Sequence, residues 1–392
     1  MMSAPKIPHQ EFQQRINSLT EQMDSQGMDA LLVYGDEYRK ENLRYVSNYW
    51  PIFERGALVL GKGQKPMVLC APEGEQVAKE MSIWPDVRLI PDFVCVTVPD
   101  KIDYPHANYS SFSEIASELR SKVSLKTLGV AGLGDMSEAM LENVRNSFSC
   151  HIADANPILF KLRKEKSENE IACLREAARL AEAGFRAMME SELIGKTERY
   201  AAAIAEGVAR KEGAECITFT VFGSGERSAR IIGRAENKII EDGDMIMCAL
   251  AIQYEGYVST YEIPFAVGNY SAKTKRVIDV LINASEAGLP HLKPGEPMKH
   301  FVRAVRDHFR KEGLAEYDVY PPLHGIGCAE AESPYTDENT DAVFESGMTV
   351  NTDISLFGLE GGSNRVEEGF VIRGNGAETL CPFMRNYFEN WK

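Results

Sequence analysis

The chain has 392 residues, of which 44% are hydrophobic and 26% are charged, and its formal net charge is −15. This composition predicts a globular protein of two or three domains and argues against disorder. The acidic balance argues against nucleic acid and anionic membranes as partners. Residues 1–8 lack the apolar core of a signal peptide, and no apolar run approaches the roughly 20 residues of a membrane span. We therefore expect a cytoplasmic protein.

The first part of the chain alternates helical and strand patterns. Residues 10–27 predict a helix, and the short apolar run at 30–34 predicts a buried strand. Two further apolar runs, at 56–60 and 66–70, flank a Gly-Lys-Gly-Gln sequence and predict a hairpin.

A helix predicted at 112–123 and a strand predicted at 127–130 complete this pattern. Helices that alternate with strands predict a three-layer α/β domain. We place this domain at residues 1–160 and a second domain at residues 161–392.

The second domain opens with a helix-start pattern. Ser167 has the properties of an N-cap, and Glu170 follows at the spacing of a capping box. Further on, the interval 195–213, which begins and ends with glycine, is repeated at 295–313, and each interval holds an amphipathic stretch. The repeat favours two related halves built of helices and strands, with a ligand site between them on the sheet.

Three motifs near the C-terminus indicate the family. His324 lies in Pro-Leu-His-Gly-Ile-Gly, Asp353 ends Gly-Met-Thr-Val-Asn-Thr-Asp, and Glu367 lies in Arg-Val-Glu-Glu. In this order and spacing they resemble the last three metal-ligand motifs of the creatinase/prolidase/aminopeptidase P family, the pita-bread metallopeptidases. The resemblance implies an α/β (α+β) chain in which a creatinase-type domain precedes a pita-bread domain with internal pseudo-two-fold symmetry.

The two earlier metal ligands of that family are aspartates on a hairpin, and here the matching positions hold Ala249 and Thr260. Neither side chain supplies the anionic oxygen that a divalent cation prefers. We therefore expect no cofactor. If an ion does bind, its ligands would be His324, Asp353 and Glu367.

Features of the creatinase branch of the family suggest how a substrate is held. Glu262 lies two residues beyond Thr260 on the same face of an alternating strand. The segment from Tyr257 onward resembles that branch, which lacks both aspartates, acts without metal and binds a guanidinium through a glutamate. Phe53 and Arg55 resemble its Phe-x-Arg motif, whose arginine reaches the partner subunit's site. The resemblance implies a homodimer in which Arg55 acts across the interface.

Other charged residues complete the expected substrate site. Arg227, Arg230 and Arg234 follow a Ser-Gly dipeptide, and arginines of this kind can clamp a carboxylate. Glu330 adds negative charge beside His324, which suits a substrate with a cationic nitrogen. The loop that follows the Ser-Gly dipeptide lacks the catalytic histidine of the creatinase branch, which argues against creatine as the substrate.

Our leading hypothesis is a metal-independent hydrolase that cleaves a non-peptide C–N bond in a small amidine, guanidine or cyclic amidine carboxylic acid, as creatinase and ectoine hydrolase do. The catalytic residues would be His324, Glu262, Asp353 and Glu367. Three alternatives stay open: a single-metal Xaa-Pro peptidase, a lyase acting on a small onium acid, and a non-catalytic pita-bread binding protein.

Overall fold

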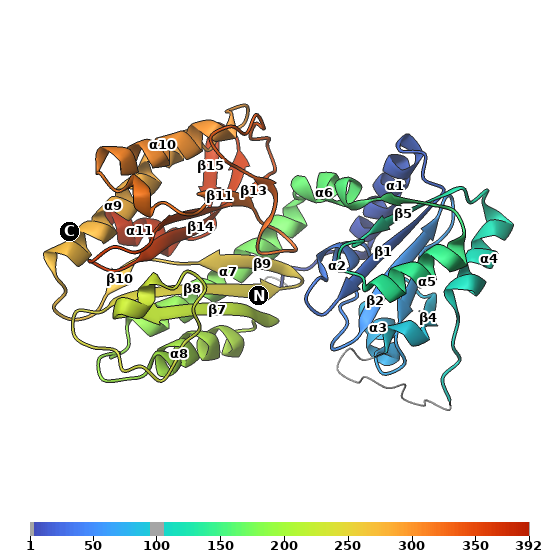
Figure 1. The fold of residues 1–392 in the computed structure, drawn as a ribbon, viewed down its shortest axis with the longest axis horizontal. Helices are drawn as coiled ribbons and strands as arrows, with labels where there is room; N and C mark the ends of the chain where they lie inside the picture. The colour runs from blue at the N-terminus through green and yellow to red at the C-terminus, as the bar shows by residue number, and fades with distance from the viewer. Residues whose placement is uncertain (1–3, 95–105, 392) are drawn as a thin grey trace. The chain divides into compact units, whose positions relative to one another are not determined.

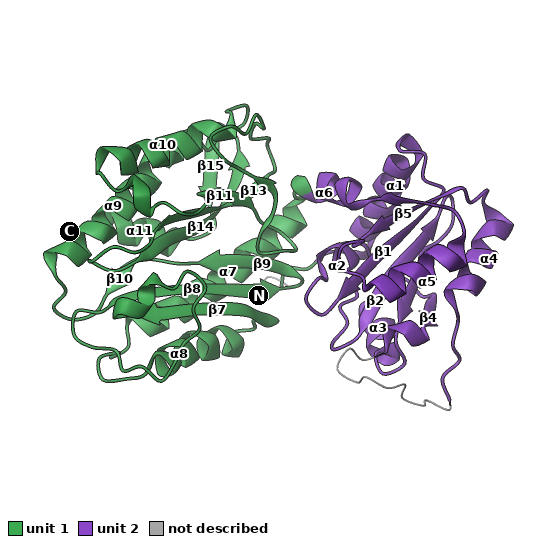
Figure 2. Ribbon diagram, in the orientation of Figure 1, with its two compact units in different colours: residues 1–6, 164–392 green, residues 7–163 purple. Residues whose placement is uncertain are grey.

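The computed structural model describes residues 4–94 and 106–391, and the chain divides into two compact units (Figure 2). Unit 2 comprises residues 7–163, and unit 1 comprises the chain from residue 164 onward together with residues 4–6. The first three residues of the N-terminal segment lie outside the described residues. Within the described ranges, no helix combines the length and apolar character needed to cross a membrane.

Unit 2 is built on one six-stranded sheet with the strand order β4-β3-β2-β1-β5-β6 (Figure 1). The strands are β1 (Ala30–Asp36), β2 (Arg55–Gly61), β3 (Met67–Cys70), β4 (Val87–Leu89), β5 (Thr127–Ala131) and β6 (His151–Asp154). The helices are α1 (His9–Ser25), α2 (Glu41–Ser47), α3 (Glu75–Met81), η1 (Pro91–Phe93), α4 (Phe112–Lys122), α5 (Glu138–Phe148) and α6 (Asn156–Lys164).

The structure confirms each helix and strand that the sequence patterns of this unit predicted. Alternate residues of β1 face opposite sides of the sheet, and all but the last residue are buried, so both faces are covered. Strands β2 and β3 pair antiparallel, as the hairpin prediction required. The division at residue 160 that we expected falls inside α6.

Unit 1 consists of two halves with the same plan. The first half contains α7 (Glu168–Met189), α8 (Glu198–Lys211), β7 (Cys216–Ser224), η2 (Gly225–Ala229), β8 (Met245–Tyr254), β9 (Tyr257–Tyr261) and β10 (Phe265–Ala266). The second half contains α9 (Ala272–Gly288), η3 (Leu289–His291), α10 (Met298–Lys311), η4 (Ala315–Tyr317), β11 (Leu323–Gly325), β12 (Glu332–Tyr335), β13 (Thr349–Leu356), β14 (Asn364–Arg373), β15 (Gly376–Thr379) and α11 (Pro382–Asn390). In each half two long helices pack together, and α7, α8 and α9 contact the strands (Figure 1).

The start of α7 confirms the predicted capping box. The Ser167 side chain accepts a hydrogen bond from the Glu170 N–H, and the Glu170 side chain accepts one from the Ser167 N–H. These bonds satisfy two N–H groups that would otherwise lack helical partners.

The two halves of unit 1 meet at the edges of their sheets. A four-stranded sheet holds β7 to β10, and a five-stranded sheet holds β11 to β15. Glu262, just beyond β9, forms an antiparallel bridge with Glu367 of β14, and their backbones exchange two hydrogen bonds of 3.1 Å. The joined sheet therefore presents one continuous face to a site shared by both halves.

Candidate active site and metal centre

The strand register brings four predicted residues to one face of the joined sheet. In an antiparallel pair, opposite residues share a face, as do residues two apart along one strand. Asp353 lies opposite Glu367, and Glu367 also pairs with Glu262. His324 lies opposite Asn351, two residues before Asp353. His324, Asp353, Glu367 and Glu262 therefore project from the same side.

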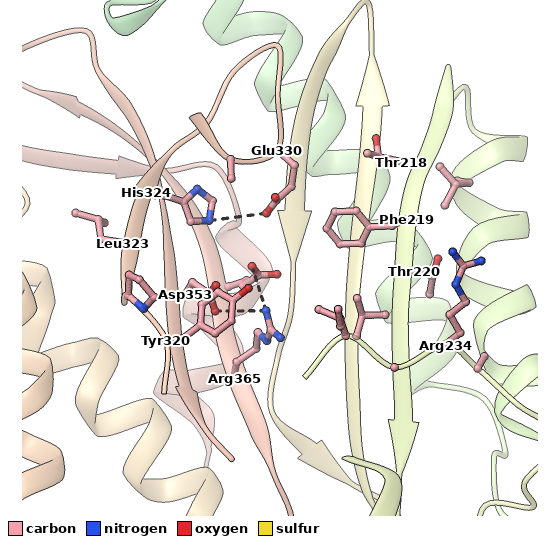
Figure 3. Close-up of a pocket in the computed structure, with 18 of the residues that line it drawn as sticks. Thr218, Phe219, Thr220, Arg234, Tyr320, Leu323, His324, Glu330, Asp353 and Arg365 are labelled. Atoms are coloured by element: carbon pink, nitrogen blue, oxygen red, sulfur yellow. Dashed lines mark hydrogen bonds and ion pairs between the residues drawn. The ribbon is translucent and has the colours of Figure 1, made fainter. Parts of the chain in front are cut away.

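A cavity of about 860 Å³ lies over this face. Its polar walls include His324, Glu330, Asp353, Arg365 and Arg234, with His324 and Arg234 on opposite sides (Figure 3). Aromatic side chains, among them Phe219 and Tyr320, complete the lining. A partly apolar cavity with a few converging polar groups is typical of a small-molecule site.

His324, Asp353 and Glu367 form a compact set of potential metal ligands. One ligand atom from each lies within 4.8 Å of the others, and all three residues are buried. The Nδ1 of His324 is 2.9 Å from the Gly325 carbonyl oxygen. Because a carbonyl can only accept, Nδ1 carries the proton and the lone pair lies on Nε2. This tautomer leaves His324 ready to coordinate through Nε2.

Arg365, two residues before Glu367 on β14, places its guanidinium among three carboxylates, of which Figure 3 labels Asp353. Its Nε lies 3.3 Å from Glu262 Oε2, and its Nη1 lies 3.4 Å from Asp353 Oδ1 and 3.8 Å from Glu367 Oε1. The resemblance to the creatinase branch implied that Glu262 would bind the cationic group of a substrate. The structure instead places a cation of the chain itself there.

Burial raises the pKa values of these three carboxyl groups. Desolvation raises the pKa of Glu262 to about 8, although the Arg365 charge works in the opposite direction. Desolvation likewise raises the pKa of Asp353 above its ordinary value and that of Glu367 well above it. When all three are ionised, one guanidinium leaves an excess of two negative charges, which is the charge that a divalent cation offsets.

Glu330 lies with these residues, as the sequence predicted. Its Oε1 is 3.8 Å from His324 Nε2 and accepts a hydrogen bond of 3.3 Å from Thr260. Thr260 lies opposite Ala251, so Ala249, two residues before Ala251, shares the same sheet face. The assignment of Ala249 and Thr260 to the family's aspartate positions stays a prediction.

Three residues expected to bind substrate do not line the cavity. Tyr257 lies on the other face of β9, because it is an odd number of residues from Thr260, and its hydroxyl donates to Glu170 at 2.9 Å. Arg227 forms ion pairs with the buried Glu198 and with Glu236. Arg230 is also paired with Glu236. Glu236 lies on the same segment as both arginines, whereas Glu198 lies on α8 and reaches Arg227 through tertiary packing, which the loop sequence alone does not reveal.

Phe53 and Arg55 belong to unit 2. Phe53 is exposed and has a left-handed backbone conformation, with φ of 61°. Arg55 Nη1 donates to the Asp92 carbonyl at 3.3 Å. A homodimer with Arg55 acting across the interface stays a prediction.

Sequence comparison decides the family. Residues 172–374 match the model of metallopeptidase family M24, and residues 15–164 match that of the creatinase/prolidase N-terminal domain. The chain belongs to family M24. This confirms the resemblance noted in the C-terminal motifs, and it confirms the fold class.

Curated relatives of this M24 chain are peptidases. The uncharacterized peptidase YqhT of Bacillus subtilis is 32% identical over 263 residues, which cover 66% of this chain and 74% of that protein. The Xaa-Pro dipeptidase of Pyrococcus furiosus is 26% identical over 377 residues, covering 95% of this chain and 99% of that protein. The crystal structure of the prolidase from Pyrococcus horikoshii OT3 superimposes with a TM-score of 0.80 at 24% identity, covering 94% of this chain and 97% of that one. The similarity to this prolidase structure shows that the two chains share a fold.

These relatives overturn the leading hypothesis drawn from the sequence. A metal-independent, creatinase-like hydrolase acting on a non-peptide C–N bond is wrong, because the family is one of metallopeptidases and an Xaa-Pro dipeptidase matches nearly the whole chain. The hypothesis gave most weight to Ala249 and Thr260, which it assigned to the family's aspartate positions. Three potential ligands, His324, Asp353 and Glu367, converge nevertheless, and their convergence depends on strand register.

The M24 site of this chain fits one divalent cation. Its three donors, one imidazole and two carboxylates, are a set that first-row divalent metals accept. Glu367 Oε2 is buried and has no hydrogen-bond partner among the described residues. A buried carboxylate oxygen without a partner is costly unless something else occupies its lone pairs. A bound ion would satisfy it.

Proposed function

We propose that the protein is a single-metal dipeptidase that hydrolyses Xaa-Pro dipeptides. The observation that carries the proposal is the buried trio of His324, Asp353 and Glu367, whose ligand atoms lie within 4.8 Å of one another. The names of the full-length relatives support the substrate class. The substrate would be a small molecule, and the cavity of about 860 Å³ is large enough for a dipeptide.

The trio would hold the ion, which, when bound, polarises the scissile carbonyl and lowers the pKa of an attacking water. Arg365 holds Asp353 and Glu367 in place through its two contacts from Nη1. Tyr320 also lines the cavity, and burial raises the pKa of its hydroxyl, which therefore remains a hydrogen-bond donor at neutral pH. That hydroxyl can stabilise the oxyanion that develops as the carbonyl is attacked.

Glu330 is the best-placed general base. It lines the cavity beside His324, its side chain is 21% exposed, and Thr260 orients its carboxylate. Glu262 suits this role less well, because it is fully buried against Arg365. Glu330 would accept a proton from the attacking water and return it to the proline nitrogen as the peptide bond breaks.

Arg234 would bind the free carboxylate of the substrate. It lines the cavity opposite His324 (Figure 3), and its guanidinium forms no ion pair within the part of the chain that the structure describes. Arg365, the other arginine of the lining, is already surrounded by carboxylates. A carboxylate anchor across the cavity from the ion would favour short substrates with a free C-terminus.

The test is a metal-reconstitution assay. Protein dialysed against a chelator is resupplied with Mn²⁺, Co²⁺ or Zn²⁺ and assayed with Ala-Pro, Met-Pro and the control dipeptide Pro-Ala. We expect hydrolysis of the two Xaa-Pro dipeptides only after metal is restored. A rate that survives chelation would contradict the proposal, as would the absence of Xaa-Pro hydrolysis with every metal.

A substitution of His324 tests whether this residue binds the ion on which the activity depends. His324→Ala should lose one bound ion per chain by inductively coupled plasma mass spectrometry, and its kcat/KM should fall at least about 100-fold. The matched control is His151→Ala, which removes an exposed histidine of β6 in unit 2. Equal metal content in the His324 variant and the control would refute the ligand assignment.

A further inference from the structure

A second group of metal-binding side chains lies outside the cavity, where η3 leads into α10. His291 and His300 both direct Nδ1 at one carboxylate oxygen of Glu296, at 3.0 and 2.8 Å. The two rings stand edge to face with their centroids 6.1 Å apart. One ligand atom from each of the three residues lies within 4.8 Å of the others. Three donors of two chemical kinds therefore converge.

The backbone that carries these donors is held in place. The Gly295 N–H donates to the Phe344 carbonyl at 2.8 Å, and the Phe344 N–H donates to the Glu296 carbonyl at 3.0 Å. The Met298 N–H donates to the Ala342 carbonyl at 2.9 Å. The donors thus lie on an ordered frame, which reduces the conformational entropy lost when an ion is bound.

The separations between donors are close to those of a metal site. In a tetrahedral zinc site with bonds of about 2.0–2.1 Å, neighbouring donor atoms lie about 3.3 Å apart. The two Nδ1–Oε1 distances, 3.0 and 2.8 Å, need to open by only about 0.3 and 0.5 Å. Each neutral ring coordinates through Nδ1 once its proton moves to Nε2. The side chains are 18–41% exposed, which leaves room for water as a further ligand.

The local charges favour a cation at this place but also supply a competitor. The Glu296 carboxylate supplies negative charge between the two imidazole rings. Lys293 Nζ lies 3.6 Å from the other carboxylate oxygen, Oε2. A metal ion would have to share Glu296 with this ammonium group.

We propose that His291, Glu296 and His300 form a second divalent-metal site that fastens η3 to the start of α10. Imidazole donors favour zinc, cobalt and nickel over magnesium and calcium, which prefer oxygen ligands. The site is independent of the proposed peptidase activity. Its ion would stabilise the corner between α10 and α9, and α9 covers β13 and β14, the strands bearing Asp353 and Glu367.

Zinc binding to the full-length protein tests this site. Isothermal titration calorimetry on chelator-treated protein should show that His291→Ala/His300→Ala binds one zinc ion per chain fewer than wild type. Glu296→Gln keeps the size of the side chain and should weaken the same site at least about tenfold. Lys293→Gln removes the competing ammonium group and should tighten the site.

Controls separate this site from the cavity and from non-specific binding. His324→Ala should leave this binding event unchanged, and His151→Ala should bind as much zinc as wild type. Magnesium used as the probe should give no binding here. The proposal is overturned if the double variant and wild type bind equal numbers of zinc ions, or if Glu296→Gln, with an unchanged circular dichroism spectrum, binds zinc as tightly as wild type.

Discussion

The two arginines of the cavity have opposite environments. Arg365 is 5% exposed and lies among Glu262, Asp353 and Glu367, whose charges outweigh the effect of burial and raise the pKa of the guanidinium. Arg234 is exposed on the other wall, and its guanidinium is paired with none of the described side chains. The first is a structural counter-ion, whereas the second is free to meet a ligand.

Replacing Arg234 should therefore weaken substrate binding more than it slows the chemical step. We expect Arg234→Ala to raise KM for Ala-Pro about 10- to 100-fold, the effect of losing a charged hydrogen-bond partner, with kcat changed little. Steady-state kinetics with Ala-Pro and with its C-terminal amide measure this. The amide lacks the anion, so the variant and wild type should process it equally.

Arg230→Ala is the matched control for that variant, because Arg230 lies on the same loop and is paired with Glu236 outside the cavity. It should keep the wild-type KM. An Arg234 variant with an unchanged KM for Ala-Pro would show that the substrate carboxylate is held elsewhere.

Glu54 in unit 2 gives a stability prediction that depends on pH. Burial raises its pKa to about 7, although the Gly74 N–H donates to it at 2.9 Å. Because the folded-state pKa lies above the unfolded value, the stability that the protonated group contributes is lost as the pH rises through 7. The free energy of unfolding of Glu54→Gln minus that of wild type should therefore increase by on the order of 1–3 kcal/mol from pH 5 to pH 8.

Urea unfolding at the two pH values, followed by tryptophan fluorescence, measures this gain. Trp50 and Trp84 report on the same unit as Glu54. Glu80→Gln, at an exposed position of α3, should show no such pH dependence. A constant difference between Glu54→Gln and wild type from pH 5 to pH 8 would contradict the shifted pKa.

Among the elements, the hairpin of β8 and β9 is where we predict that the site departs from the family pattern. Ala249 and Thr260 lie on the face that also carries Glu262, and Glu262 pairs with Glu367. Aspartates at these two positions would add two carboxylates next to the proposed ligands. They would form the oxygen-rich part of a second metal position.

We expect Ala249→Asp/Thr260→Asp to bind one more Mn²⁺ or Co²⁺ per chain than wild type, measured by inductively coupled plasma mass spectrometry. Without metal the variant should melt at a lower temperature than wild type, because two further carboxylates would be desolvated beside like charges. The neutral control, Ala249→Asn/Thr260→Asn, should gain no ion. The aspartate variant would fail the prediction if its metal content equalled that of this control.

Strand alternation explains which site residues the sequence could identify. Residues two apart on one strand share a face, so Glu262 follows from Thr260, and Arg365 could have been inferred from Glu367 in the same way. The same rule argues against a position for Tyr257 in the cavity, because its side chain faces α7. Arg227 could not be placed from local patterns, because its partner Glu198 lies on another element.

For the whole molecule, the sequence predicts fold better than chemistry. The capping box at Ser167, the predicted strands of unit 2 and the repeated helices of unit 1 are local or periodic features, and the structure contains them all. The function was misjudged because the sequence shows directly that Ala249 and Thr260 carry no carboxylate, and this absence received too much weight. The convergence of His324, Asp353 and Glu367 requires the register of three strands.

Arg365 supplies a positive charge that is synthesised with the polypeptide, whereas a metal ion has to be acquired afterwards. Its guanidinium contacts all three buried carboxylates and reduces their mutual repulsion before any ion arrives. If the activity is metal-dependent, as we propose, we expect newly made chains to fold without an ion and to stay inactive until one binds. A renewed supply of metal would then activate protein that already exists.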